Sequence, residues 1–153
     1  MTTIFKKEES KTVTRSKGNL KKTFILTVAG GLAFWLANFA ISRTPIAAEY
    51  RAALSISYYP MLLEALFGGL IIGFWVSYLL LRFFDRIPAK DPILKSVLIS
   101  LLVLLIVTIS IGNPSVYHQT PDSLRYFFIG SVFNFIRILA LGAAIGYGCK
   151  RQF

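Results

Sequence analysis

The sequence predicts an all-α fold: a polytopic membrane protein built as a bundle of four transmembrane helices, with both termini in the cytoplasm. Four apolar stretches alternate with short polar connectors, and each stretch has about the 17 to 25 residues that a spanning helix needs. Composition agrees, because 55% hydrophobic residues with a mean hydropathy of +0.62 exceed what a soluble domain of 153 residues can bury. The stretches cover residues 23–41, 59–81, 93–111 and 127–147.

Lysine and arginine are concentrated on alternate connectors. Seven precede the first stretch, four lie in the middle loop over residues 82–95, and two follow the fourth stretch, whereas the first and third connectors together hold three. Because these residues accumulate on the cytoplasmic side of membranes, we expect both termini inside, in a cell membrane of the prokaryotic type. This placement accounts for the net charge of +10, so no nucleic-acid partner is expected.

The chain is expected to divide into three parts. Residues 1–22 form a basic cytoplasmic tail, in which apolar residues are too sparse to offset the entropy of ordering. Residues 23–149 form the membrane domain, and residues 150–153 form a cytoplasmic C-terminus. Anionic lipid headgroups would attract the tail by about 1 kcal/mol for each basic residue, although the orientation of the protein alone explains the same charge.

Proline and turn residues predict the connectors in order. After Pro45, residues 46–54 are expected to form a short interfacial helix, because proline is favourable in the first turn of a helix. Pro88 and Pro92 are expected to end the second spanning helix and begin the third, which makes a tight hairpin. The third connector, residues 112–126, contains two turn signals.

Small residues recur every fourth position in three of the four stretches. Such residues let helix backbones approach one another in lipid, where apolarity alone cannot drive helices together. The third stretch is instead rich in leucine, isoleucine and valine, so we expect it at the periphery. The predicted packing residues are Ala29, Ala33 and Ala37 in the first stretch, Ala65, Gly69, Gly73 and Ser77 in the second, and Gly142 and Gly146 in the fourth.

Arg137 and Glu64 lie well inside apolar stretches, and an ionised side chain there costs roughly 2.5 to 3.5 kcal/mol. Arg137 is in the fourth stretch and Glu64 in the second. Their depths predict an ion pair between the two helices, with a further hydrogen bond from Asn134. The pair could be a structural salt bridge or a site for a substrate or proton. Asn38 is a candidate for a further buried amide.

One side of the second stretch is expected to face a polar interior of the bundle. It carries Glu64, Gly68, Trp75 and Tyr78. These positions lie on one broad side of a helix, next to the small-residue positions of that stretch. The sequence therefore predicts a bundle whose inside is partly polar.

Known catalytic and cofactor motifs are not evident in the sequence. The chain has one histidine, His118, and one cysteine, Cys149, in connectors or span ends at opposite faces of the membrane. A metal site needs several clustered ligands, so neither a metal nor another cofactor is expected. A membrane transferase that uses Arg137 to hold a lipid phosphate is a minority alternative, for which no base or nucleophile can be named.

The sequence therefore favours a small non-enzymatic integral membrane protein. It would act as an accessory or structural subunit of a membrane complex, or as a homo-oligomer, with the lipid bilayer and other membrane chains as its partners. The alternative is a small transporter or channel that uses Glu64 and Arg137.

Overall fold

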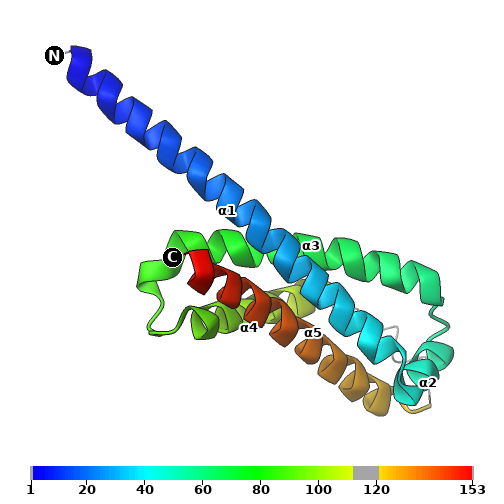
Figure 1. The fold of residues 1–153 in the computed structure, drawn as a ribbon. Helices are drawn as coiled ribbons and strands as arrows, with labels where there is room; N and C mark the ends of the chain where they lie inside the picture. Colours follow the sequence, from blue (N-terminus) through cyan, green and yellow to red (C-terminus); the bar gives the residue numbers. More distant parts are fainter. Residues whose placement is uncertain (1, 112–120, 153) are drawn as a thin grey trace.

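The fold is a bundle of four long helices, as predicted (Figure 1). The computed structural model describes the backbone of residues 2–111 and 121–152 and the side chains of residues 19–110 and 121–152. All regular elements in these ranges are helical, and four helices are long and apolar enough to cross a membrane. The elements are α1 (Thr2–Ser42), α2 (Pro45–Ala53), α3 (Tyr58–Phe83), the 3-10 helix η1 (Phe84–Arg86), α4 (Pro92–Ile111) and α5 (Ser123–Gln152).

Helix α1 is longer than the first apolar stretch. It begins at Thr2 and continues into the spanning segment, so its first half projects beyond the other helices in Figure 1. The backbone of residues 2–22 is therefore helical, which corrects the expectation that this part is too poor in apolar residues to be ordered, whereas its division from the membrane domain as a cytoplasmic tail stays a prediction. The physical reason is that no proline occurs before Pro45, so a helix formed in the membrane can extend toward the N-terminus one residue at a time.

The short helix expected after Pro45 is confirmed as α2, which turns the chain between α1 and α3. Thr44 is its N-cap, and the Thr44 hydroxyl oxygen accepts a hydrogen bond from the Ala47 amide at 3.3 Å. Pro45 occupies the first turn, where its missing N–H has no cost. Beyond the C-terminal end of α2, Ser55 adopts a left-handed conformation with φ of 54°, and the chain then enters α3.

The connector between α3 and α4 is compact. Lys95 of α4 is buried and donates a hydrogen bond from Nζ to the Phe84 carbonyl oxygen at 2.6 Å. The same ammonium lies 4.0 Å from the centroid of the Phe84 ring. At the start of α4, the Asp91 carboxylate accepts a hydrogen bond from the Ile93 amide at 3.1 Å. The predicted hairpin between α3 and α4 is thus stabilised by Lys95 and by the Asp91 cap of α4.

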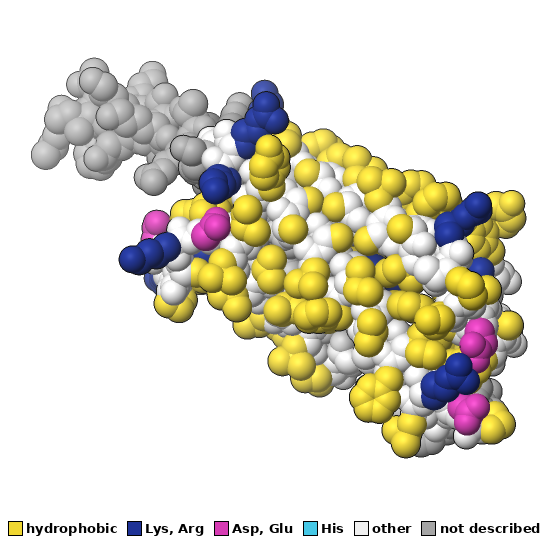
Figure 2. Space-filling view, turned by 60° about the horizontal axis from the view of Figure 1, so that its bottom comes forward, with side chains coloured by type: hydrophobic (Ala, Val, Ile, Leu, Met, Phe, Trp, Pro, Cys, Tyr) yellow, Lys and Arg dark blue, Asp and Glu magenta, His cyan; other side chains and the backbone are white. Residues whose placement is uncertain are grey.

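Helix α1 packs against both α3 and α5, whereas α4 packs mainly against α5. Helices α3 and α5 have little contact with each other because α1 separates them over much of their length. The shared core is apolar and includes Leu26, Val76, Leu80, Ile138, Leu141 and Ile145. Figure 2 shows hydrophobic side chains over the side of the bundle and charged side chains mainly toward its two ends. This distribution suits a bundle surrounded by lipid.

The predicted small residues of α3 lie against α1. A Cβ added to Gly69 would come 3.2 Å from the Gly31 carbonyl oxygen, and one added to Gly73 would come 3.0 Å from that of Thr27. Ser77 is fully buried, and Ala65 is partly buried. This side of α3 therefore allows two helix backbones to approach closely.

On α1, the closest approaches are made by two glycines that the alanine spacing did not single out. A Cβ added to Gly30 would lie 2.6 Å from the Ile145 side chain, and one added to Gly31 would lie 2.6 Å from the Leu70 side chain. The predicted Ala29, Ala33 and Ala37 are each only partly buried. Adjacent glycines let α1 contact α5 on one side and α3 on the other.

Helix α4 is less peripheral than its composition suggested. A Cβ added to Gly142 would lie 2.8 Å from the Ser100 hydroxyl oxygen, and one added to Gly146 would lie 2.5 Å from the Ile93 Cα. Ser96 and Ser100 are fully buried, while leucines on the other side of α4 are exposed. One side of α4 therefore packs tightly on α5, and the expectation of a mainly lipid-facing helix holds only for the other side.

Candidate functional site

A cavity with several polar residues in a mainly apolar lining lies between α1, α2 and α5, near the end of the bundle where α2 is found; we call this end the α2 end. The cavity has a volume of about 150 Å³. Apolar side chains such as Ile41, Met61 and Phe133 form part of its wall. Its polar lining consists of Asn38 and Ser42 from α1, Tyr50 and Arg51 from α2, and Arg137 from α5.

Asn38 and Arg137 bring unmet hydrogen-bonding groups to this cavity. The Asn38 side chain is 1% exposed, and neither its amide nitrogen nor its oxygen has a partner among the described residues. Within the same residues, the buried Nε of Arg137 also lacks an acceptor. Buried polar groups normally have partners, so these atoms indicate a place that a bound group or water occupies.

Arg137 has one hydrogen bond to a described residue. Its Nη1 donates to the Asn134 Oδ1, one turn earlier on α5, at 3.0 Å. The Asn134 contact therefore lies where the sequence placed it. Because Nη1 is used in this way, the edge formed by Nε and Nη2 is left for another acceptor.

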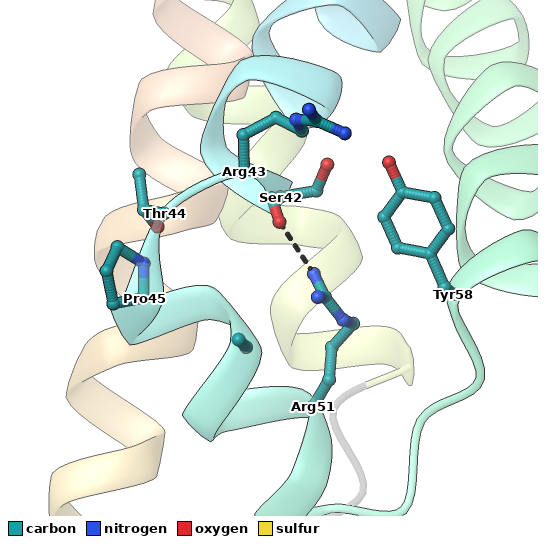
Figure 3. Close-up of a pocket in the computed structure, with 7 residues that line it drawn as sticks. Ser42, Arg43, Thr44, Pro45, Arg51 and Tyr58 are labelled. Carbon is teal, nitrogen blue, oxygen red and sulfur yellow. Dashed lines mark hydrogen bonds between the residues drawn. The ribbon is translucent and has the colours of Figure 1, made fainter.

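Arg51 lines both this cavity and an open hollow of about 360 Å³, whose lining residues are drawn in Figure 3. Its Nη1 donates to the Ser42 carbonyl oxygen at 3.0 Å, and its guanidinium carbon is 5.0 Å from the centroid of the Tyr58 ring. Ser42 and Arg51 line both spaces, and Arg43 adds a further cation to the hollow. The role of Arg51 could not be predicted from the sequence, because only the fold of α2 brings it back onto α1.

The predicted ion pair between Glu64 and Arg137 is not formed. Glu64 is exposed and has no ion pair with any described residue, since α1 separates its helix from α5. Among the described residues, an ion pair at this end joins Arg125 to Glu49, with 3.0 Å between Nη2 and Oε1. Tyr126 also donates from its hydroxyl to the same Glu49 oxygen, Oε1, at 3.4 Å. Glu49 is therefore already engaged, and no carboxylate lines the Arg137 cavity.

The second-stretch side that was expected inside the bundle lies on its outside. We define the α3 outer face as Glu64, Gly68, Ile71, Trp75 and Tyr78. Trp75 is 52% exposed and Ile71 is 62% exposed, and a Cβ added to Gly68 would have no atom within 4 Å. Only the neighbouring side with Gly69, Gly73 and Ser77 packs on α1. Adjacent helix positions are about 100° apart, which explains why one side is buried and the other is not.

Metal-ligand side chains are scattered in the described part of the chain. No group of three or more His, Cys, Asp or Glu residues there could hold a metal ion. His118 lies outside the described residues, as does most of the third connector. Cys149 is fully buried and packs in the apolar core.

Together these features define a four-helix integral membrane protein with a cationic cavity at one end. Comparison with protein-family models, with curated proteins and with solved structures finds no match for the chain. The function must therefore be argued from the cavity and from the α3 outer face.

Proposed function

We propose that this chain is a non-enzymatic accessory subunit that joins another membrane protein through the α3 outer face. The observation that supports the proposal is the exposure of Glu64 and Trp75, with open space beside Gly68, on one side of a membrane helix. Carboxylates in membrane helices are usually turned toward protein, and a glycine on an open side lets a second helix approach closely.

The spacing of the α3 outer face suits helix packing along most of α3. Its five residues are separated by four, three, four and three positions, which is the spacing of a seam between two helices. Glu64 lies about 9 Å and Trp75 about 26 Å from the start of α3. The indole N–H of Trp75 has no acceptor among the described residues, and an acceptor on a partner helix would satisfy it.

A foreign partner suits this face better than a second copy of the chain. In a two-fold dimer that used the α3 outer face, parallel copies would place one Glu64 at the same depth as the other. Like charges at close range disfavour such a contact in a poorly screened environment. A partner helix with a cation or hydrogen-bond donor at that depth would stabilise the carboxylate instead.

The proposal includes the orientation of the chain in the membrane. The basic residues support an N-in, C-in arrangement, which places the α2 end at the outer surface and the basic N-terminal part of α1 near anionic headgroups of the inner leaflet. The partner would then meet Glu64 near the outer boundary of the bilayer.

Site-specific photocrosslinking in the native membrane tests the accessory role. A photoreactive residue at Ile71 of the α3 outer face should give one adduct of fixed mass with a foreign membrane protein. The matched control is the same probe at Ile109 of α4, which is 75% exposed and outside the face. Gly68→Leu and Glu64→Ala should each abolish the Ile71 adduct. Adducts with lipid alone, or equal adducts from both positions, would contradict the proposal, and an adduct with a second copy would replace it with a homo-oligomer.

The cavity favours a second candidate, a small transporter whose pathway uses Arg137. Ionisable residues that line a space within a membrane bundle often lie on a substrate path. The purified chain in sealed vesicles should then carry a small anion, and Arg137→Gln should stop the flux. Absence of flux in vesicles that contain folded protein would exclude transport by this chain alone.

A further inference from the structure

We propose that the cavity between α1, α2 and α5 binds an oxyanion, a phosphate or carboxylate group, through Arg137 and Asn38, with Arg51 at its mouth. The inference is independent of the accessory role, because it uses none of the residues of the α3 outer face. It concerns only the cavity of about 150 Å³ at the α2 end.

Charge is the first argument. Arg51 and Arg137 both line the cavity, and no carboxylate does. The acid nearest in sequence to Arg51 that could have balanced them, Glu49, is paired with Arg125 at 3.0 Å and accepts from Tyr126. A partly enclosed space with two guanidinium groups and no acid attracts an anion.

The geometry of Arg137 is the second argument. Its Nη1 is engaged by Asn134, whereas its buried Nε has no acceptor among the described residues. The Nε and Nη2 hydrogens point the same way and match two oxygens of one carboxylate or phosphate. The hydrogen bond from Nη1 therefore holds the guanidinium while leaving free the edge that recognises oxyanions.

Asn38 is the third argument. It is 99% buried, it lines the same cavity, and neither polar atom of its amide has a partner within the described part of the chain. Its amide N–H groups can donate to an anion, and its oxygen can accept from a hydroxyl of a singly protonated phosphate or from water. A buried amide with both ends unmet costs free energy unless such a group is present.

The open hollow suggests the route by which the anion arrives. Arg43 and Arg51 line the hollow (Figure 3), and Arg51 also lines the cavity. The Arg51 guanidinium donates to the Ser42 carbonyl and lies over Tyr58, so it is held at the boundary between the two spaces. An anion drawn to the hollow would pass Arg51 to reach Arg137.

The first test measures binding of defined probes to the full chain in neutral-lipid nanodiscs. Inorganic phosphate and acetate are titrated separately at constant ionic strength, with chloride as the reference salt. At least one probe should bind, and Arg137→Gln should raise the dissociation constant of that probe at least tenfold. Arg82→Gln removes the same charge from an exposed position at the other end of α3 and should leave binding unchanged.

A second variant keeps the test valid if Arg137→Gln does not fold. Asn38→Asp preserves the shape of the side chain and places a carboxylate in the cavity beside Arg137. The variant should be at least as thermally stable as the native chain, because the arginine gains a counterion, and it should no longer bind phosphate or acetate. If Arg137 has a purely structural role, Asn38→Asp should still raise the thermal stability, but the native chain should bind neither phosphate nor acetate.

The source of the anion is tested in a separate arm. Nanodiscs of phosphatidylcholine with and without phosphatidic acid are compared by native mass spectrometry. Retention of phosphatidic acid by the native chain but not by Asn38→Asp would identify a lipid phosphate, whereas binding of the free ions alone would identify a small soluble anion. The proposal is overturned if no probe binds. It is also overturned if Arg137→Gln, Asn38→Asp and Arg82→Gln all bind the probes as the native chain does. Either result would mean that the cavity holds only water.

Discussion

Arg51 donates a hydrogen bond from its Nη1 to the carbonyl oxygen of Ser42, the last residue of α1, at 3.0 Å. The last carbonyl groups of a helix have no partner within the helix, so a side chain that reaches them stabilises the helix end. Arg51 belongs to α2, nine residues further along the chain. The contact therefore ties α2 to α1 and fixes the wall that separates the hollow from the cavity.

Removing this tie should loosen α2 without unfolding the bundle. A hydrogen bond from a charged donor contributes about 1.5 to 3 kcal/mol, so Arg51→Met should raise amide exchange in residues 43–56 by about tenfold or more. Hydrogen exchange with mass spectrometry measures the effect. Arg43→Met is the matched control, since Arg43 is exposed and its exchange profile should stay close to that of the native chain. Equal protection in both variants would show that the Arg51 contact does not hold α2.

Two glycines that differ only in their surroundings should respond oppositely to alanine. At Gly146 the new Cβ would lie 2.5 Å from the Ile93 Cα and 3.1 Å from the Pro92 carbonyl oxygen, so α4 and α5 must separate. Gly146→Ala should lower the free energy of unfolding by about 1 to 3 kcal/mol. Gly68→Ala meets nothing within 4 Å and should be neutral or slightly stabilising in the isolated chain, because alanine favours helix. Denaturant unfolding in detergent measures both, and equal losses would contradict the packing described.

The bundle and its short helix could be predicted from the sequence because each depends on local pattern. Apolar length predicted four spanning helices, and Pro45 predicted α2. The spacing of small residues in the second and fourth stretches likewise pointed to the sides of α3 and α5 that pack on α1 and α4. These features require no knowledge of which helices are neighbours.

The candidate site could be predicted only in part, because it depends on helix order around the bundle. Depth alone allowed Glu64 to meet Arg137, but α1 separates α3 from α5 and leaves Glu64 outside. Arg51 was counted only as a connector charge, yet the turn at Thr44 brings it to the cavity. Asn134 was placed correctly because it is one turn from Arg137 on the same helix.

Lys95, in the first turn of α4, should contribute to stability through its contacts with Phe84. It is 8% exposed, and its ammonium both donates to the Phe84 carbonyl at 2.6 Å and lies over the Phe84 ring. Lys95→Met should lower the free energy of unfolding by about 1.5 to 3 kcal/mol through loss of this charged donor. The exposed Lys90 provides the control, and Lys90→Met should change stability by less than about 0.5 kcal/mol. Similar unfolding curves for the two variants would show that the Lys95 contact contributes little.

The ion pair between Glu49 and Arg125 should contribute little to stability despite its length of 3.0 Å. Both side chains are about half exposed, and pairs of this kind are worth roughly 0 to 1 kcal/mol. Glu49→Gln should therefore lower the free energy of unfolding by no more than about 1 kcal/mol, and the difference should disappear at about 1 M salt, where the Debye length is about 3 Å. A larger or salt-independent loss in denaturant unfolding would mean that Glu49 has a further role at the α2 end.

Single-cysteine labelling should determine which end of the bundle faces the outside. Cys149 is the sole cysteine, so a Cys149→Ser chain provides a clean background for Ala48→Cys in α2 and Lys90→Cys in the α3 to α4 connector. Both positions are exposed and lie at opposite ends of the bundle. Because the connector with Lys90 is basic and the one with Ala48 is not, an impermeant maleimide should label Ala48→Cys in intact cells and Lys90→Cys only after the membrane is opened. The reverse pattern would put the α2 end in the cytoplasm, so that the Arg137 cavity would draw its anion from the cytoplasm or the inner leaflet.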